Sequence, residues 1–130
     1  MECLDPAVFK IVCPGVSLDK IKAALDDAVQ HFGRNKVFSN VIIGLGESDK
    51  ALREGIEELA EIGVMPTLRA VYPHPLRKDE IYMVRPSAER LLSLARYTRR
   101  VLDKYDLHGD QTETMCYRCT GCDLVPHRDL

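Results

Sequence analysis

Apolar runs and amphipathic stretches alternate along this chain, and the alternation predicts an α/β fold. The run V-F-S-N-V-I-I at residues 37–43 is rich in β-branched side chains, which is typical of a parallel strand buried on both faces. A second apolar run covers about residues 64–72, and its proline stands near the start, where a strand tolerates one. We therefore predict two parallel strands at these positions, covered by helices.

Apolar residues recur at helical spacing in three longer stretches, and we predict helices at about 18–32, 49–62 and 87–105. Gly33 and Gly109 are predicted to end the first and the third of these helices, because glycine adopts the left-handed conformation that helix ends favour. A short helix is predicted from Asp5 to about Val12, because Asp suits the N-cap and Pro6 the first helical position.

Two glycines and a carboxylate follow the first predicted strand at once. Gly44 and Gly46 allow a sharp turn and the close approach of a flat ligand, because neither has a Cβ. In parallel α/β folds this edge of the sheet is where ligands bind. Glu47 is predicted to open the next helix, where a carboxylate meets unpaired backbone N–H groups. Its role as a structural cap and a role in ligand binding both stay open.

The stretch N-V-I-I-G-L-G-E, which starts at Asn40, resembles the G-x-I-x-G-x-x-E strand motif of radical S-adenosylmethionine (SAM) enzymes. Its G-L-G-E ending is similar to the biotin synthase and lipoyl synthase branch, although Asn40 stands where the motif has its first glycine. The resemblance implies SAM as the cofactor, with its adenine packed on Ile42. It also assigns cofactor binding to Gly44, Gly46 and Glu47.

The N-terminal block E-C-L-D-P-A-V-F-K-I-V-C-P-G resembles the segment that leaves the fourth barrel strand in the same branch. By this resemblance Glu2 offers a carboxylate to the ribose hydroxyls of SAM; without it, Glu2 is a solvated terminal residue. The implied fold is the C-terminal half of a TIM-type radical SAM barrel over residues 1–108, with parallel strands inside and helices outside. Residues 109–130 then form a separate cysteine-rich tail.

Arg69 is the strongest candidate for binding a substrate. Alternation along the second strand places it on one face with Thr67 and Val71. An unpaired guanidinium buried against helices is very costly, so we expect Arg69 to face the barrel interior. There it binds a substrate carboxylate or phosphate, or it forms a structural salt bridge. His74 follows in a proline-rich loop and either reaches the mouth of the site or is merely exposed.

The tail contains Cys116, Cys119 and Cys122 in a C-x-x-C-x-x-C array. Thiolates at this spacing can wrap one metal centre, and the same spacing starts the cluster-binding run of bacterial ferredoxins. We favour an iron–sulfur cluster, with zinc and free thiols as alternatives. His108, His127 or an exogenous group could supply a fourth ligand.

The C-x-x-x-C-x-x-C motif that holds the activating cluster of radical SAM enzymes does not occur in the sequence. We therefore expect that this chain alone does not generate the deoxyadenosyl radical. Two classes of function stay open. The chain is the C-terminal part of a radical SAM enzyme with an auxiliary cluster, acting on a small molecule; or it is a non-catalytic metal-binding α/β scaffold or subunit. An N-terminal half or a second copy of the chain is the expected partner.

Composition and charge narrow the remaining choices. The chain has 130 residues, enough for one domain, and a net charge of −2 gives no field that would attract nucleic acid or anionic membranes. The arginine-rich helix near the C-terminus has no interleaved aromatic residues, so we expect a solvated surface there. No apolar run is long enough to span a bilayer and no signal peptide is visible, so the expected location is the cytoplasm.

Overall fold

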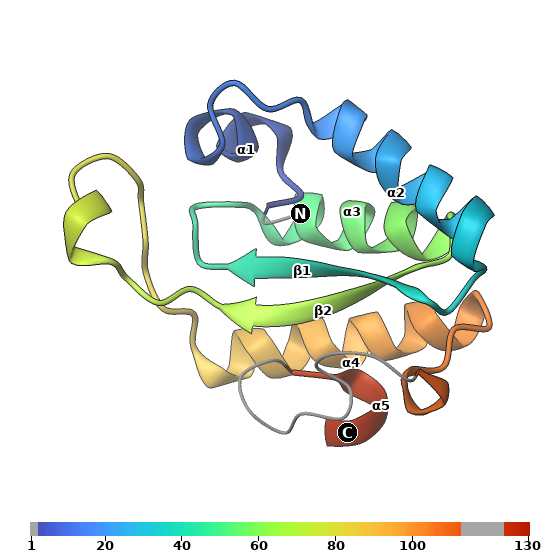
Figure 1. Ribbon diagram of the computed structural model, residues 1–130. Coiled ribbons are helices and arrows are strands. Elements are labelled where there is room, and N and C mark those ends of the chain that lie inside the picture. Colours follow the sequence, from blue (N-terminus) through green and yellow to red (C-terminus); the bar gives the residue numbers. More distant parts are fainter. Residues whose placement is uncertain (1–2, 113–123) are drawn as a thin grey trace.

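A computed structural model describes residues 3–112 and 124–130 and has a mixed α/β architecture (Figure 1). Its helices and strands, in order, are α1 (Pro6–Val12), α2 (Leu18–Phe32), β1 (Val37–Ile43), α3 (Asp49–Glu61), β2 (Val64–Ala70), the 3₁₀ helix η1 (Pro75–Arg77), α4 (Ala88–Lys104), the 3₁₀ helix η2 (Gly109–Gln111) and α5 (Pro126–Asp129). The four predicted helices and the two predicted strands are all present.

β1 and β2 run parallel and form the sheet of the described residues. The register pairs Val37 with Val64 and Ile43 with Ala70, and α3 makes the crossover between the two strands. This arrangement confirms the α/β class with parallel strands. The described part of the chain does not form a closed barrel, and the half barrel therefore stays a prediction.

The two faces of β1 differ in burial, so the prediction of a strand buried on both faces was wrong. Val41 and Ile43 are fully buried in the main core, together with leucines and isoleucines from α3 and α4. On the other face Ile42 is half-buried and Asn40 is exposed. Asn40 is polar and is not part of the core. Its Oδ1 accepts a hydrogen bond from Thr67 Oγ1 on β2 at 2.6 Å.

Side-chain caps explain why the helices begin where they do. Asp5 accepts hydrogen bonds from the backbone N–H groups of Ala7 and Val8, and Pro6 occupies the first turn of α1. The other three long helices start after serines whose hydroxyl oxygens accept a backbone N–H three residues later: Ser17, Ser48 and Ser87. Glu47 therefore does not open α3 as predicted, because Ser48 is the N-cap.

The end of α4 also differs from the prediction. The helix stops at Lys104, and the chain turns at Asp106, which has a positive φ of 54°. Gly109 does not end α4; it begins η2. An aspartate adopts the left-handed region more readily than most side chains, so the turn occurs before the glycine.

The described end of the tail packs against the rest of the chain. Leu124 forms an antiparallel bridge with Leu68, with N···O distances of 2.9 and 3.3 Å, and so covers the outer edge of β2 at that point. Val125 is fully buried in the main core, and α5 packs on α4 (Figure 1). None of the helices in the part of the chain that the structure describes combines the length and apolarity needed to cross a bilayer.

Candidate functional site

The glycine turn after β1 is held tightly by the loop that follows β2. Gly44 has a φ of 110°, and a Cβ on it would lie 2.2 Å from the carbonyl oxygen of Val84. The N–H of Val84 donates to the carbonyl oxygen of Gly44 at 2.9 Å. Glycine is therefore required here by the approach of another backbone segment, in addition to its conformation.

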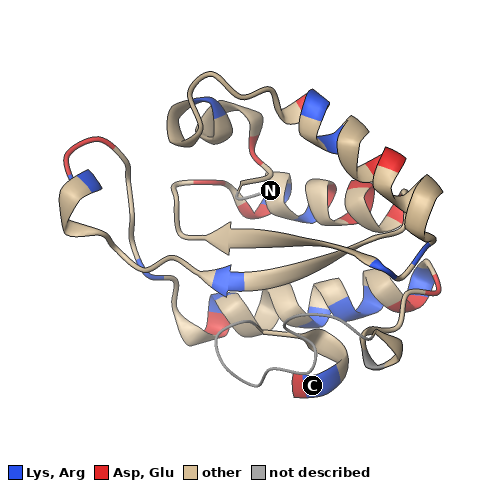
Figure 2. Ribbon diagram, viewed as in Figure 1, with Lys and Arg blue, Asp and Glu red and all other residues tan. Residues whose placement is uncertain are grey.

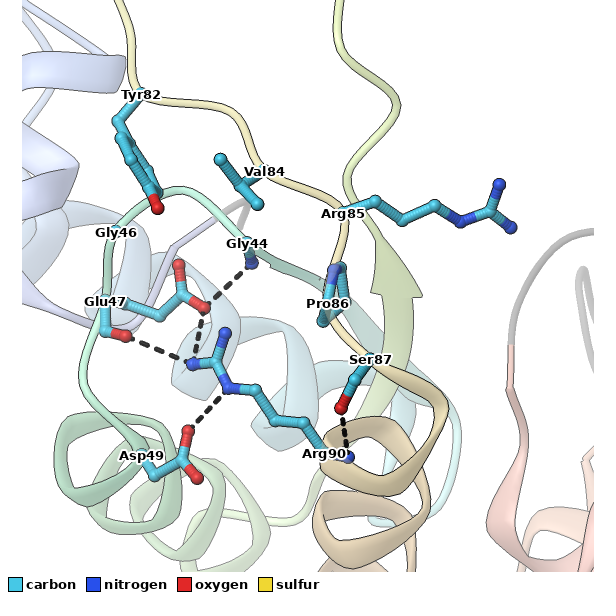
Figure 3. A pocket seen from close by; sticks show the side chains of 10 residues that line it. All are labelled: Gly44, Gly46, Glu47, Asp49, Tyr82, Val84, Arg85, Pro86, Ser87 and Arg90. Carbon is cyan, nitrogen blue, oxygen red and sulfur yellow. Dashed lines mark hydrogen bonds and ion pairs between the residues drawn. The ribbon is translucent and has the colours of Figure 1, made fainter.

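The buried side chain of Glu47 stabilises this turn by accepting backbone hydrogen bonds. Its side chain is completely buried; Oε1 accepts the N–H of Gly44 at 2.8 Å, and Oε2 accepts the N–H of Leu45 at 2.7 Å. Arg90 of α4 donates through Nη2 to Glu47 Oε1 and to the Glu47 carbonyl oxygen, both at 3.1 Å (Figure 3). Both carboxylate oxygens accept hydrogen bonds from the protein, so Glu47 fixes the shape of the turn.

Arg90 connects three segments of the chain at this site. Its Nε donates to Asp49 at 2.7 Å, while its Nη2 reaches Glu47. Partial burial opposes its positive charge, but the neighbouring carboxylates of Asp49 and Glu47 raise its pKa above the ordinary value. Sequence reasoning missed this role, because Arg90 lies 43 positions after Glu47 and looks like any other arginine of an amphipathic helix.

A cavity of about 700 Å³ lies between the glycine turn and the start of α4 (Figure 3). It is lined by Gly44, Gly46, Glu47, Asp49, Tyr82, Val84, Arg85, Pro86, Ser87 and Arg90. The ring of Tyr82 stands over Gly46, and a Cβ on Gly46 would come within 3.3 Å of it. Three of the predicted cofactor residues, Gly44, Gly46 and Glu47, therefore meet here.

The other two predicted residues that the structure describes, Ile42 and Arg69, meet in a separate groove of about 330 Å³. They are partners in the strand register, so their side chains share the less buried face of the sheet. Leu45, between the two glycines, also lines this groove. The glycine turn thus contributes residues to both the groove and the larger cavity.

The cysteines near the N-terminus are packing residues. Cys3 is fully buried in a small cluster with Phe9 and Leu45, and burial raises the pKa of its thiol to about 11. Cys13 is half-buried against the same cluster. A neutral thiol is a poor metal ligand at ordinary pH, because the thiolate is the form that binds.

Two of the candidate fourth ligands already have carboxylate partners. His127 Nε2 lies 3.1 Å from Asp103 Oδ1, and His108 Nε2 lies 2.8 Å from Asp106 Oδ1. Among the side chains that the structure describes, no group of three or more from Cys, His, Asp or Glu is arranged to hold a metal ion. The candidate ligands Cys116, Cys119 and Cys122, like Glu2, lie outside the described residues.

Known proteins provide no further constraint on the site. The chain matches no protein-family model, no curated protein and no solved structure. The sequence motifs and the geometry of the turn, the cavity and the groove are therefore the basis for inferring function.

Proposed function

We propose that this chain supplies the SAM-binding C-terminal part of a radical SAM-type enzyme that acts on a small molecule. The observation that carries the proposal is the position of Ile42 and Arg69. They lie side by side at the carboxyl ends of two parallel strands, on the less buried face of the sheet, directly before a glycine turn. Ligands of parallel α/β folds bind at this edge.

The chemistry of the groove supports the adenine-binding part of the proposal. Ile42 and Leu45 offer apolar side chains to a flat ring, and a groove of about 330 Å³ lies within the size range of small-molecule sites. Glu47 then acts as a positioning residue, since it orders Gly44 and Leu45 through their N–H groups. SAM, when bound, supplies an activated sulfonium centre.

Two further assignments belong to this proposal. Cys116, Cys119 and Cys122 hold an auxiliary iron–sulfur cluster, and Glu2 binds the ribose of SAM. The sequence spacing of the cysteines supports the first, and the resemblance of the N-terminal block supports the second. The enzyme is cytoplasmic, and an N-terminal half of the barrel or a second copy of the chain completes the sheet.

Titration of SAM into the purified protein by isothermal calorimetry tests the proposal. We expect binding in the wild type and a loss of affinity of at least about tenfold in Ile42→Ser, which removes the apolar surface under the adenine. Ile11→Ser is the matched control, because Ile11 is exposed and does not line the groove. No binding of SAM, or equal effects of the two substitutions, would overturn the SAM assignment.

Anaerobic reconstitution tests the metal assignment, with iron, acid-labile sulfide and zinc measured in parallel. We expect iron and sulfide in the wild type and their loss in Cys119→Ser, while Cys13→Ser retains them. Binding of zinc without sulfide would instead favour the hypothesis that the chain is a zinc-binding scaffold. If Cys119→Ser and Cys13→Ser bind equal amounts of metal, the C-terminal tail is not the metal site.

A further inference from the structure

The groove beside Ile42 contains polar groups that the contact of adenine with Ile42 and Leu45 does not use. Its walls are mainly apolar, with contributions from Val12, Leu45, Val71, Ile81 and Met83. Arg69, His74 and Arg77 also line it. Two of these three come from the loop after β2, so the groove joins the end of the sheet to that loop.

His74 offers a hydrogen-bond donor from a ring that one backbone hydrogen bond orients. It is the N-cap of η1, and its Nδ1 accepts the backbone N–H of Leu76 at 3.3 Å. A nitrogen that accepts a hydrogen bond carries no proton, so the neutral ring has its proton on Nε2. Among the described residues this Nε2–H has no partner, and it is available to an acceptor on a ligand.

Arg77 keeps most of its donors available. Its Nε donates to Glu80 Oε2 at 2.9 Å, in an ion pair whose side chains are 44% and 65% exposed. An exposed pair of this kind contributes little and yields easily to a competing anion. Within the described part of the chain, the two terminal nitrogens of Arg77 make no hydrogen bond, and they can meet an oxyanion bidentately.

The charge of the groove has one sign among its described lining residues. Arg69 and Arg77 are positive, and neither Asp nor Glu is among the residues that line it. The acidic residues of the same loop, Asp79 and Glu80, do not line the groove. Basic residues lie at the end of β2 and in the loop that follows it (Figure 2). A cationic site with apolar walls complements an amphiphilic anion.

We propose that this groove binds an organic anion with a short apolar body, whose carboxylate or phosphate is held by His74 and Arg77 beside Arg69. The role of this anion as the substrate rests on the proposed function; its binding does not. The apolar body lies against Val71, Ile81 and Met83. His74 and Arg77 are thus specificity residues contributed by the loop.

The test uses four hexyl compounds that share one apolar body: hexanoate, hexyl phosphate, hexylammonium and hexanol. Each is titrated into the full chain without SAM, with isothermal calorimetry for affinity and ¹H–¹⁵N shifts for location. We expect both anions to bind and to shift the signals of the loop after β2. The amine and the alcohol should bind at least about tenfold more weakly. The ratio of the two anion affinities distinguishes a carboxylate site from a phosphate site.

Two variants of the same loop provide the decisive comparison. Arg77→Gln should weaken anion binding about tenfold, whereas Lys78→Gln, an equal charge change at the neighbouring exposed residue, should leave it unchanged. Equal losses in both variants would mean a diffuse charge effect and would overturn the proposal. Binding of hexanol or hexylammonium as tight as that of the anions, or no binding of either anion, would also overturn it.

A separate SAM titration keeps this inference distinct from the proposed function. If the anions bind and SAM does not, the anion site stands and the SAM assignment fails. If SAM binds and the anions do not, the groove belongs to the cofactor alone and the anion site is refuted.

Discussion

Glu47 is the residue on which the candidate site most depends. Its buried carboxylate accepts two backbone N–H groups of the turn and pairs with Arg90, so three donors balance one charge. A buried carboxylate with this many donors is stable only while all of them remain. Glu47, which the motif assigns to the cofactor, also orders the backbone of Gly44 and Leu45.

Replacing Glu47 by Gln tests this role. Glu47→Gln directs an NH₂ group toward a backbone N–H and removes the buried one of the two carboxylates that pair with Arg90. We expect a loss of about 2–3 kcal/mol in the free energy of unfolding, measured by urea denaturation. Asp49→Asn is the control, because Asp49 is about half exposed and its pairing with Arg90 should contribute less than about 1 kcal/mol. Equal losses of unfolding free energy in the two variants would mean that Asp49 is the main partner of Arg90.

Cys3 gives a residue-level prediction for alkaline pH. Its folded pKa, about 11, is raised above the ordinary value of 9.0 by burial. The unfolded chain therefore releases the thiol proton first. The corresponding stability is present below pH 9 and is lost as the pH rises from 9 toward 11, by up to about 3 kcal/mol. Cys3→Ala should show a shallower decline over this window than Cys13→Ala; parallel curves would contradict the prediction.

At the scale of elements, local signals predicted most of the fold. β1 has the bounds expected from its β-branched run and the glycine that closes it, and α2 and α4 start after Ser17 and Ser87, whose hydroxyls cap them. The errors have physical reasons as well. The polar Asn40 within β1 marks an exposed face, and the alternating burial of this strand was hidden by the neighbouring apolar side chains.

Contacts between distant elements were beyond local signals. The sequence indicated a glycine turn, but it contained nothing to show that the loop after β2 would return and donate from Val84 to Gly44. For the same reason it could not pair Arg90 with Glu47. Ile42 and Arg69 were each predicted as site residues, but only the strand register shows that they share one face. The role of Arg77 depends on the path of the loop.

The loop after β2 packs closely on the glycine turn, so a methyl group added at Gly44 should lower stability strongly. Gly44→Ala must adopt a φ of 110° and places its Cβ against the Val84 carbonyl oxygen. Gly15→Ala, with a φ of 84° and open space around it, carries the backbone strain alone. We expect Gly44→Ala to lose about 2 kcal/mol more stability than Gly15→Ala in urea denaturation. A difference near zero would mean that the loop moves aside freely.

At the scale of the whole molecule, the described C-terminal residues complete the main core. Leu124 pairs with β2, and Val125 is fully buried among side chains that include Leu68 and Leu102. The edge of β2 is thereby protected at one point from pairing with another chain. The end of the chain and the central sheet should therefore unfold together.

Shortening the side chain of Val125 tests whether the C-terminal residues and the sheet unfold together. Val125→Ala leaves a cavity in the main core, and we expect a loss of about 1–3 kcal/mol in global stability. Because the Leu68 amide donates to the Leu124 carbonyl oxygen, its hydrogen exchange should accelerate in step with global unfolding. Leu130→Ala, at a site that is 45% exposed, should change neither quantity. Faster exchange at Leu68 without a loss of global stability would show that the C-terminal segment opens independently, and the sheet would then hold without it.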